Sequence, residues 1–100
     1  MKYILQCDFP YAGPWGEEMN TFMEGLAKSI NDEPGVIWKF WTVNESKQEA
    51  GGIYLFDREK DAEAYLSMHE ARLLKAGIPK VFGKIFAVNE YLSKINNAPL

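Results

Sequence analysis

The chain has 100 residues, of which 47% are hydrophobic and 14% aromatic, and its net charge is −3 at pH 7. This length corresponds to one domain, residues 1–100. A domain this small leaves much of its surface exposed, and a homodimer would bury part of that surface. The Lys and Arg residues are dispersed, which argues against nucleic acid and against an anionic membrane surface as partners. A single cysteine, a short apolar run at the N-terminus and no membrane-spanning stretch favour a cytoplasmic protein.

The first half of the chain predicts a strand, a helix and a hairpin, in that order. Residues 2–9 alternate as a strand, and a loop rich in proline and glycine follows. Residues 17–31 predict a helix, which Pro34 and Gly35 terminate. Residues 36–44 and 52–56 then read as two antiparallel strands joined by a polar connection longer than a tight turn. The apolar stripe of the helix consists of Met19, Phe22, Met23, Leu26 and Ile30.

The second half predicts a helix, a strand and a short tail. Asp57 is a candidate N-cap for a helix over residues 58–76, and Gly77 fits its C-terminal stop. Residues 80–89 predict the last strand, and the remaining tail has room for a short turn of helix and an arm. The apolar stripe of the second helix contains Ala62, Leu66, His69, Leu73 and Ala76, with Tyr65 and Arg72 beside it.

This order, β-α-β-β-α-β, predicts an α+β, ferredoxin-like fold with a four-stranded antiparallel sheet and two helices on one face. Alternation places apolar residues on both faces of the strands. In the strand at 36–44, Val36, Trp38 and Phe40 fall on one side, and Ile37, Trp41 and Val43 on the other. A sheet apolar on both faces needs cover on both. We therefore expect a second copy of the chain to cover the face that the helices leave open.

Three residues could carry acid–base or nucleophilic chemistry. His69 lies on the core-facing stripe of its helix, where it is either a buried structural histidine or an acid, base or ligand contact in a pocket. Arg72 projects close to His69 and either extends to water, binds an anionic group or pairs with Glu49. Cys7 lies on an apolar strand face, where a thiol is usually inert packing.

The aromatic hairpin offers further candidates. Trp38 and Trp41 are three residues apart on a strand, so they point to opposite faces. One should face the helices and any pocket, and the other a dimer interface, but alternation does not say which. Glu49 and the two glycines after it either shape the hairpin or border a pocket. Trp15 precedes the first helix, where it either covers the mouth of a pocket or packs on the partner, and we expect the packing role.

The sequence gives no sign of a bound cofactor. One His and one Cys, far apart, make a zinc site very improbable, and no dinucleotide or phosphate-binding glycine motif is present. We therefore expect no cofactor and no metal.

The chain resembles a known family over almost its whole length. Four stretches carry the resemblance: NDEPGVIWKFWT, EAGGIYLF, AYLSMHEARL and VNEYLSKIN. They resemble the YdhR-like mono-oxygenases of the dimeric α/β-barrel superfamily. The resemblance implies a ferredoxin-like protomer whose sheet packs on the sheet of a second protomer. It also implies a pocket between sheet and helices, in which related enzymes oxidise aromatic polyketides or quinols with dioxygen and without metal or flavin.

On this basis we expect a cofactor-independent mono-oxygenase acting on a small phenol, quinol or polyketide-like substrate. His69 would be the base or the hydrogen-bond partner of the phenolic oxygen, and Arg72 would stabilise negative charge. The expected substrate-binding residues are Trp38, Tyr65, Glu49 and Tyr54. The alternatives are a non-catalytic module that binds a small hydrophobic ligand and, last, haem binding through His69.

Overall fold

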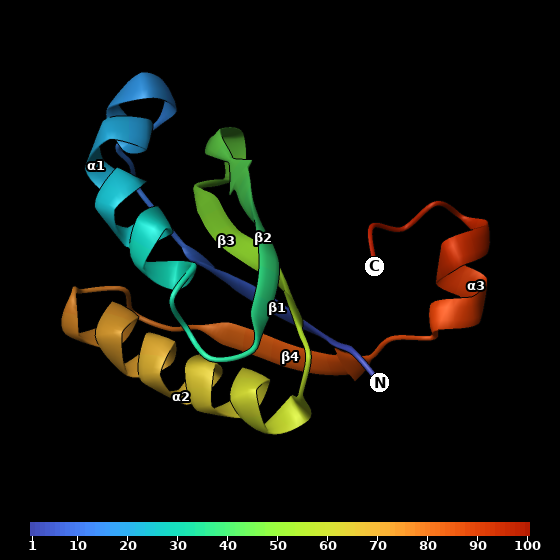
Figure 1. The fold of residues 1–100 in the computed structure, drawn as a ribbon. Coiled ribbons are helices and arrows are strands. Elements are labelled where there is room, and N and C mark those ends of the chain that lie inside the picture. The colour runs from blue at the N-terminus through green and yellow to red at the C-terminus, as the bar shows by residue number, and fades with distance from the viewer.

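The computed structural model describes residues 1–100. Four strands and two long helices follow one another as the sequence predicts, and a short third helix lies in the tail (Figure 1). No helix combines the length and the apolar character that crossing a bilayer requires. The elements are β1 (Tyr3–Pro10), α1 (Gly16–Ile30), β2 (Val36–Asn44), the 3-10 turn η1 (Glu45–Lys47), β3 (Glu49–Phe56), α2 (Glu59–Lys75), β4 (Phe82–Ala87) and α3 (Glu90–Ile95).

The four strands form one antiparallel sheet in the order β2-β3-β1-β4. This arrangement confirms the predicted α+β, ferredoxin-like topology. One buried cluster joins Ile30 of α1 and Tyr65 of α2 to Leu5 and Cys7 of β1, so both helices cover the same face of the sheet. Figure 1 shows α3 and the C-terminal arm standing apart from these two helices.

Several predicted boundaries are corrected. β3 begins at Glu49 rather than at residue 52, and β4 is shorter than the predicted range 80–89. Arg58, not Asp57, is the N-cap of α2, and no side chain caps that helix end. Gly77 has φ +99°, the left-handed conformation expected of a residue that stops a helix.

A β-bulge in β2 decides which side chains face the helices. Val36 pairs with Phe56, but Trp38 pairs with the next residue of β3, Leu55, so Ile37 is left over. Because of this extra residue, Val36 lies on the same face as Trp41, not on the face of Trp38 as simple alternation predicts. Trp41 pairs with Gly52, which is opposite the buried Cys7, and it therefore faces the helices.

The glycine pair of β3 allows backbone and side chains to approach closely. A Cβ atom on Gly51 would collide with the carbonyl oxygen of Cys7 on β1. A Cβ atom on Gly52 would lie 2.5 Å from Cε of Lys39, whose side chain crosses β3 at this point. The EAGG segment thus makes room for its neighbours rather than forming a loop.

This geometry predicts that Gly51→Ala destabilises the protein strongly, because backbone must move to accept the methyl group. We expect the free energy of unfolding to fall by roughly 2 kcal/mol or more in urea denaturation. Gly25→Ala is the matched control, since Gly25 lies within α1 with no atom within 4 Å of the added Cβ. That variant should gain up to about 1 kcal/mol from helix propensity. Equal effects of the two substitutions would contradict the packing at Gly51.

The face of the sheet away from the helices carries exposed aromatic residues on its two edge strands, β2 and β4, with Gln6 and Asp8 of β1 between them. Phe40 is 55% exposed, Phe82 53% and Phe86 48%. The C-terminal arm reaches this side, where the indole N–H of Trp38 donates a hydrogen bond to the carbonyl oxygen of Pro99 at 2.7 Å. The prediction of apolar residues on both sides of β2 and β4 is confirmed, and the second face of the sheet is named the open face below.

Candidate active site

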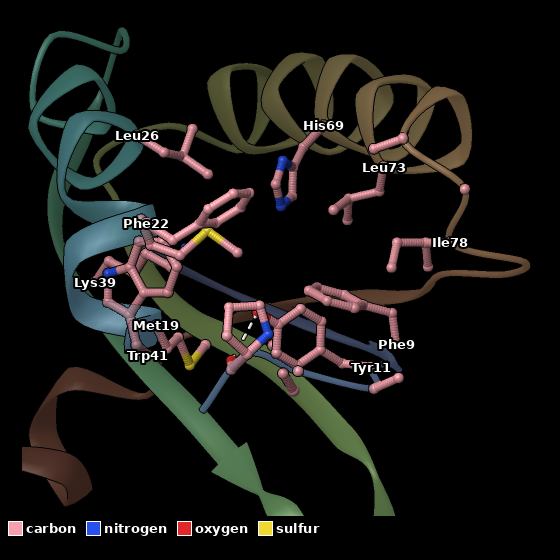
Figure 2. Close-up of a pocket in the computed structure, with 18 residues that line it drawn as sticks. Phe9, Tyr11, Met19, Phe22, Leu26, Lys39, Trp41, His69, Leu73 and Ile78 are labelled. Carbon is pink, nitrogen blue, oxygen red and sulfur yellow. Dashed lines mark hydrogen bonds between the residues drawn. The ribbon is translucent and has the colours of Figure 1, made fainter. Parts of the chain in front are cut away.

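A cavity of about 360 Å³ opens between α1, α2 and one end of the sheet (Figure 2). In Figure 2, His69 and Leu73 project into it from α2, across from Phe22 of α1 and Phe9 of β1. Its 18 lining residues are predominantly apolar or aromatic, and none is Asp or Glu. They are Phe9, Tyr11, Ala12, Gly13, Pro14, Met19, Phe22, Met23, Leu26, Lys39, Trp41, Ala50, Gly51, His69, Leu73, Ala76, Gly77 and Ile78.

The loop between β1 and α1 forms one wall of the cavity. The Tyr11 hydroxyl donates a hydrogen bond to the carbonyl oxygen of Pro14 at 2.9 Å, which holds this loop closed on itself. Trp15 packs edge-on against Tyr11 with ring centroids 5.0 Å apart, and it does not line the cavity. Trp15 therefore packs within its own chain, and its packing on a partner stays a prediction.

His69 and Arg72 form a hydrogen-bonded pair on α2. Nη2 of Arg72 lies 2.9 Å from Nδ1 of His69, and the His69 side chain is buried. A guanidinium group can only donate, so Nδ1 must accept and the proton of the neutral imidazole resides on Nε2. Nε2 has no hydrogen-bond partner in the protein, and the ring projects into the cavity (Figure 2). His69 therefore presents an N–H donor to a ligand.

The charge state of His69 supports this role. Burial, followed by the positive charges of Arg72 and Lys39, lowers the pKa of His69 to about 4. At neutral pH the imidazole is therefore uncharged and a poor proton acceptor. Arg72 does not extend to water, as a lone arginine usually does, and it forms no ion pair with Glu49.

Lys39 is the residue that the sequence reading missed. Its ammonium lies 3.5 Å from the ring centroid of Trp41 and 4.7 Å from that of Tyr54, and no carboxylate pairs with it. Burial, with a further contribution from Arg72, lowers the pKa of Lys39 to about 7. The signal in the sequence was a single lysine within a strand that is apolar on both faces, two residues before Trp41.

Two predicted substrate-binding tyrosines lie beneath the cavity rather than in its wall. The hydroxyl groups of Tyr54 and Tyr65 are 3.1 Å apart and hydrogen-bonded, and burial raises the pKa of both. Tyr65 stacks on His69 with ring centroids 5.3 Å apart. In this buried pair, Tyr65 thus packs against the His69 ring and Tyr54 against the Lys39 ammonium.

The other candidates lie away from the cavity or are inert. Trp38 faces the open side, so Trp41 is the tryptophan at the cavity. Glu49 is exposed at the start of β3, does not line the cavity and contacts neither His69 nor Arg72. Cys7 is buried, and burial raises the pKa of its thiol to about 11, as expected of a packing residue.

The comparisons with known proteins agree with this fold. The family model described as "Putative mono-oxygenase ydhR" matches residues 4–99. The chain belongs to this family. A solved structure titled "Structural Genomics, protein YJCS" is similar with a TM-score of 0.61 and 19% identity, over 88% of this chain and 98% of that one. At this identity the likeness shows the shared fold alone, and no curated protein matches the chain.

The His69–Arg72 pair predicts a definite histidine tautomer. Because His69 is the only histidine, ¹⁵N NMR of the imidazole reads it without overlap. We expect a protonated Nε2, an unprotonated Nδ1 and a titration midpoint near about 4. In Arg72→Met the tautomers should mix and the pKa of His69 should rise, because the donor and its charge are lost.

Arg58→Met is the control for this experiment, since Arg58 is an exposed arginine at the opposite end of α2, where it pairs with Asp61. It should leave the imidazole spectrum unchanged. A spectrum with the proton on Nδ1 in the unmodified protein would contradict the assignment.

Proposed function

We propose that the protein is a mono-oxygenase that oxidises a small, electron-rich phenol or quinol in the cavity between sheet and helices, without a bound cofactor. Membership of the ydhR family supports the reaction class. One observation carries the proposal. An otherwise apolar cavity contains both an amine that can be neutral near pH 7, that of Lys39, and a free imidazole N–H, that of His69. This combination suits a substrate that must lose a proton and then hold negative charge.

The two polar residues have different roles. Lys39, whose pKa is about 7, takes the proton of the substrate hydroxyl. His69 donates from Nε2 to the resulting oxyanion, because Arg72 occupies its other nitrogen. Of the two roles expected for His69, the hydrogen-bond partner is thus favoured over the base. Arg72 acts through His69 as a positioning residue.

The aromatic wall serves the ring of the substrate. Trp41, Phe9 and Phe22 line the cavity near the polar pair, so a planar substrate can pack against them while its oxygen reaches Lys39. The closed apolar surroundings also exclude water from the reactive anion. Tyr54 and Tyr65 support this arrangement from behind without touching the substrate.

The substrate itself supplies the electrons. A quinol anion transfers four electrons to dioxygen in total, one oxygen atom forms a new C–O bond on the ring, and the other leaves as water. The products are a hydroxyquinone and one water molecule, so a hydroquinone and one dioxygen balance without an added reductant. The protein binds, deprotonates and orients the substrate and holds its negative charge.

Loss of the amine should abolish most of the reaction. We expect Lys39→Met to lower the rate of oxygen uptake with hydroquinones or anthrones at least about 100-fold, the usual contribution of a general base. Because only the neutral amine accepts a proton, the rate of the unmodified protein should rise with pH through about 7. Lys75→Met, at an exposed position in the last turn of α2, is the control and should retain full activity.

If the same compounds bind tightly but no oxygen is consumed at any pH, the protein is the non-catalytic ligand-binding module instead. A flat pH profile between pH 6 and 8 would remove Lys39 from the role of base.

We propose further that the protein works as a homodimer that packs open face against open face, giving the dimeric α/β barrel. The exposed Phe40 lies on β2, and the exposed Phe82 and Phe86 lie on β4, so aromatic residues occupy both edges of the open face. Exposed aromatic surface of this kind is typical of an interface. A symmetric contact would place the same strands of both copies against one another.

A charge on the open face should prevent this association. We expect Phe40→Glu to sediment as a monomer at micromolar concentration, where the unmodified protein is a dimer. Leu74→Glu is the control, because Leu74 is 45% exposed on α2, away from the open face. Dimers that persist in Phe40→Glu and dissociate in Leu74→Glu would place the interface on the helices.

A further inference from the structure

The polar side chains of the cavity include two free hydrogen-bond donors and no carboxylate. Lys39 carries an amine, His69 offers its Nε2–H, and no carboxylate lines the wall. The Tyr11 hydroxyl already donates to Pro14. A ligand that complements this set must bring acceptor atoms, and preferably a negative charge.

We infer that the cavity selects planar aromatic weak acids and holds them as monoanions, with Lys39 as the counter-charge and His69 as the second donor. The inference rests on the cavity of the proposed function but does not depend on oxidation. It widens the substrate class to aromatic carboxylates, enols and phenols that share one anionic oxygen group. It also predicts that neutral and cationic analogues of the same shape are rejected.

The electrostatic surroundings of Lys39 favour such a ligand. Its ammonium faces the rings of Trp41 and Tyr54 and has Arg72 as a positive neighbour, and it takes part in none of the ion pairs of the chain. A half-buried cation without a partner is partly desolvated, so a bound anion offsets this cost and pairs with it directly. The ligand thus completes an ion pair of which the protein supplies only one half.

Glycine at position 52 makes this half-pair possible. The Lys39 side chain crosses β3 over Gly52, where any larger residue would meet Cε of the lysine. The amine is held toward the cavity instead of turning to solvent at the edge of the sheet. Arg72 in turn keeps the proton of His69 on the nitrogen that faces the ligand.

The volume of the cavity, about 360 Å³, lies in the range of small-ligand sites and suits a body of two fused rings. A series built on naphthalene therefore separates charge from shape. 2-Naphthoate is already an anion in water, 2-naphthol ionises only by giving its proton to the site, methyl 2-naphthoate is neutral, and 2-naphthylmethylamine is a cation.

The experiment is isothermal titration calorimetry on the full chain, at pH 6.5 and without oxygen. We expect 2-naphthoate to bind at least about tenfold more tightly than its methyl ester, and the amine to bind most weakly. 2-Naphthol should bind more tightly at pH 8 than at pH 6.5, because the neutral amine of Lys39 can then take its proton, which distinguishes an anion made in the site from one supplied by solution. At pH 8, binding of 2-naphthoate should take up protons, seen as a heat that depends on the buffer.

Lys39→Met should lose the preference for the anion and still bind the ester, which shows that the variant is folded and its cavity intact. Lys39→Arg should retain the preference, and Lys75→Met should behave as the unmodified protein. The inference is overturned if the ester binds as tightly as 2-naphthoate, or if the preference survives in Lys39→Met.

The result is separable from the proposed function. Anion binding without oxygen uptake by any ligand refutes the mono-oxygenase and leaves the inference intact. Oxygen uptake by a protein that binds 2-naphthoate no more tightly than its methyl ester refutes the inference and leaves the mono-oxygenase intact.

Discussion

The central constraint of this molecule is a half-buried lysine without a counter-charge. Lys39 lies over two aromatic rings, and the missing side chain of Gly52 gives it that place. The rest of the site follows from this constraint. Arg72 bonds to Nδ1 of His69 and fixes its tautomer. The hydrogen-bonded pair of Tyr54 and Tyr65 packs against Lys39 and His69. Together these residues present donors and positive charge to an apolar cavity.

Strand β2 serves two surfaces at once. Lys39 and Trp41 face the cavity, whereas Trp38 and Phe40 face the open side, where their rings stack with centroids 4.7 Å apart. The predicted chemistry and the predicted assembly therefore depend on alternate residues of the same strand. Neither set can be repositioned without moving the other, because both are fixed by the pairing of β2 with β3.

The sequence predicted the order of elements, the topology and the position of His69 on a core-facing stripe, because these depend on apolar periodicity. It did not predict that Lys39 lines the cavity, since the faces of a strand are assigned from its apolar residues and not from a charged one. The bulge at Ile37 was equally hidden, so Val36 was assigned to the wrong face. The bond between Arg72 and His69 depends on side-chain rotamers, for which spacing indicates only proximity.

The bulge at Ile37 also determines how β2 tolerates changes in length. Ile37 has no partner on β3, so its deletion would leave Val36 opposite Phe56 and Trp38 opposite Leu55, with every later side chain on its present face. A deletion anywhere from residue 39 to residue 43 would instead exchange the two faces over part of the strand, and Trp38 would turn toward the helices. Ile37 is thus the position at which β2 can be shortened without loss of a paired side chain or a change of register.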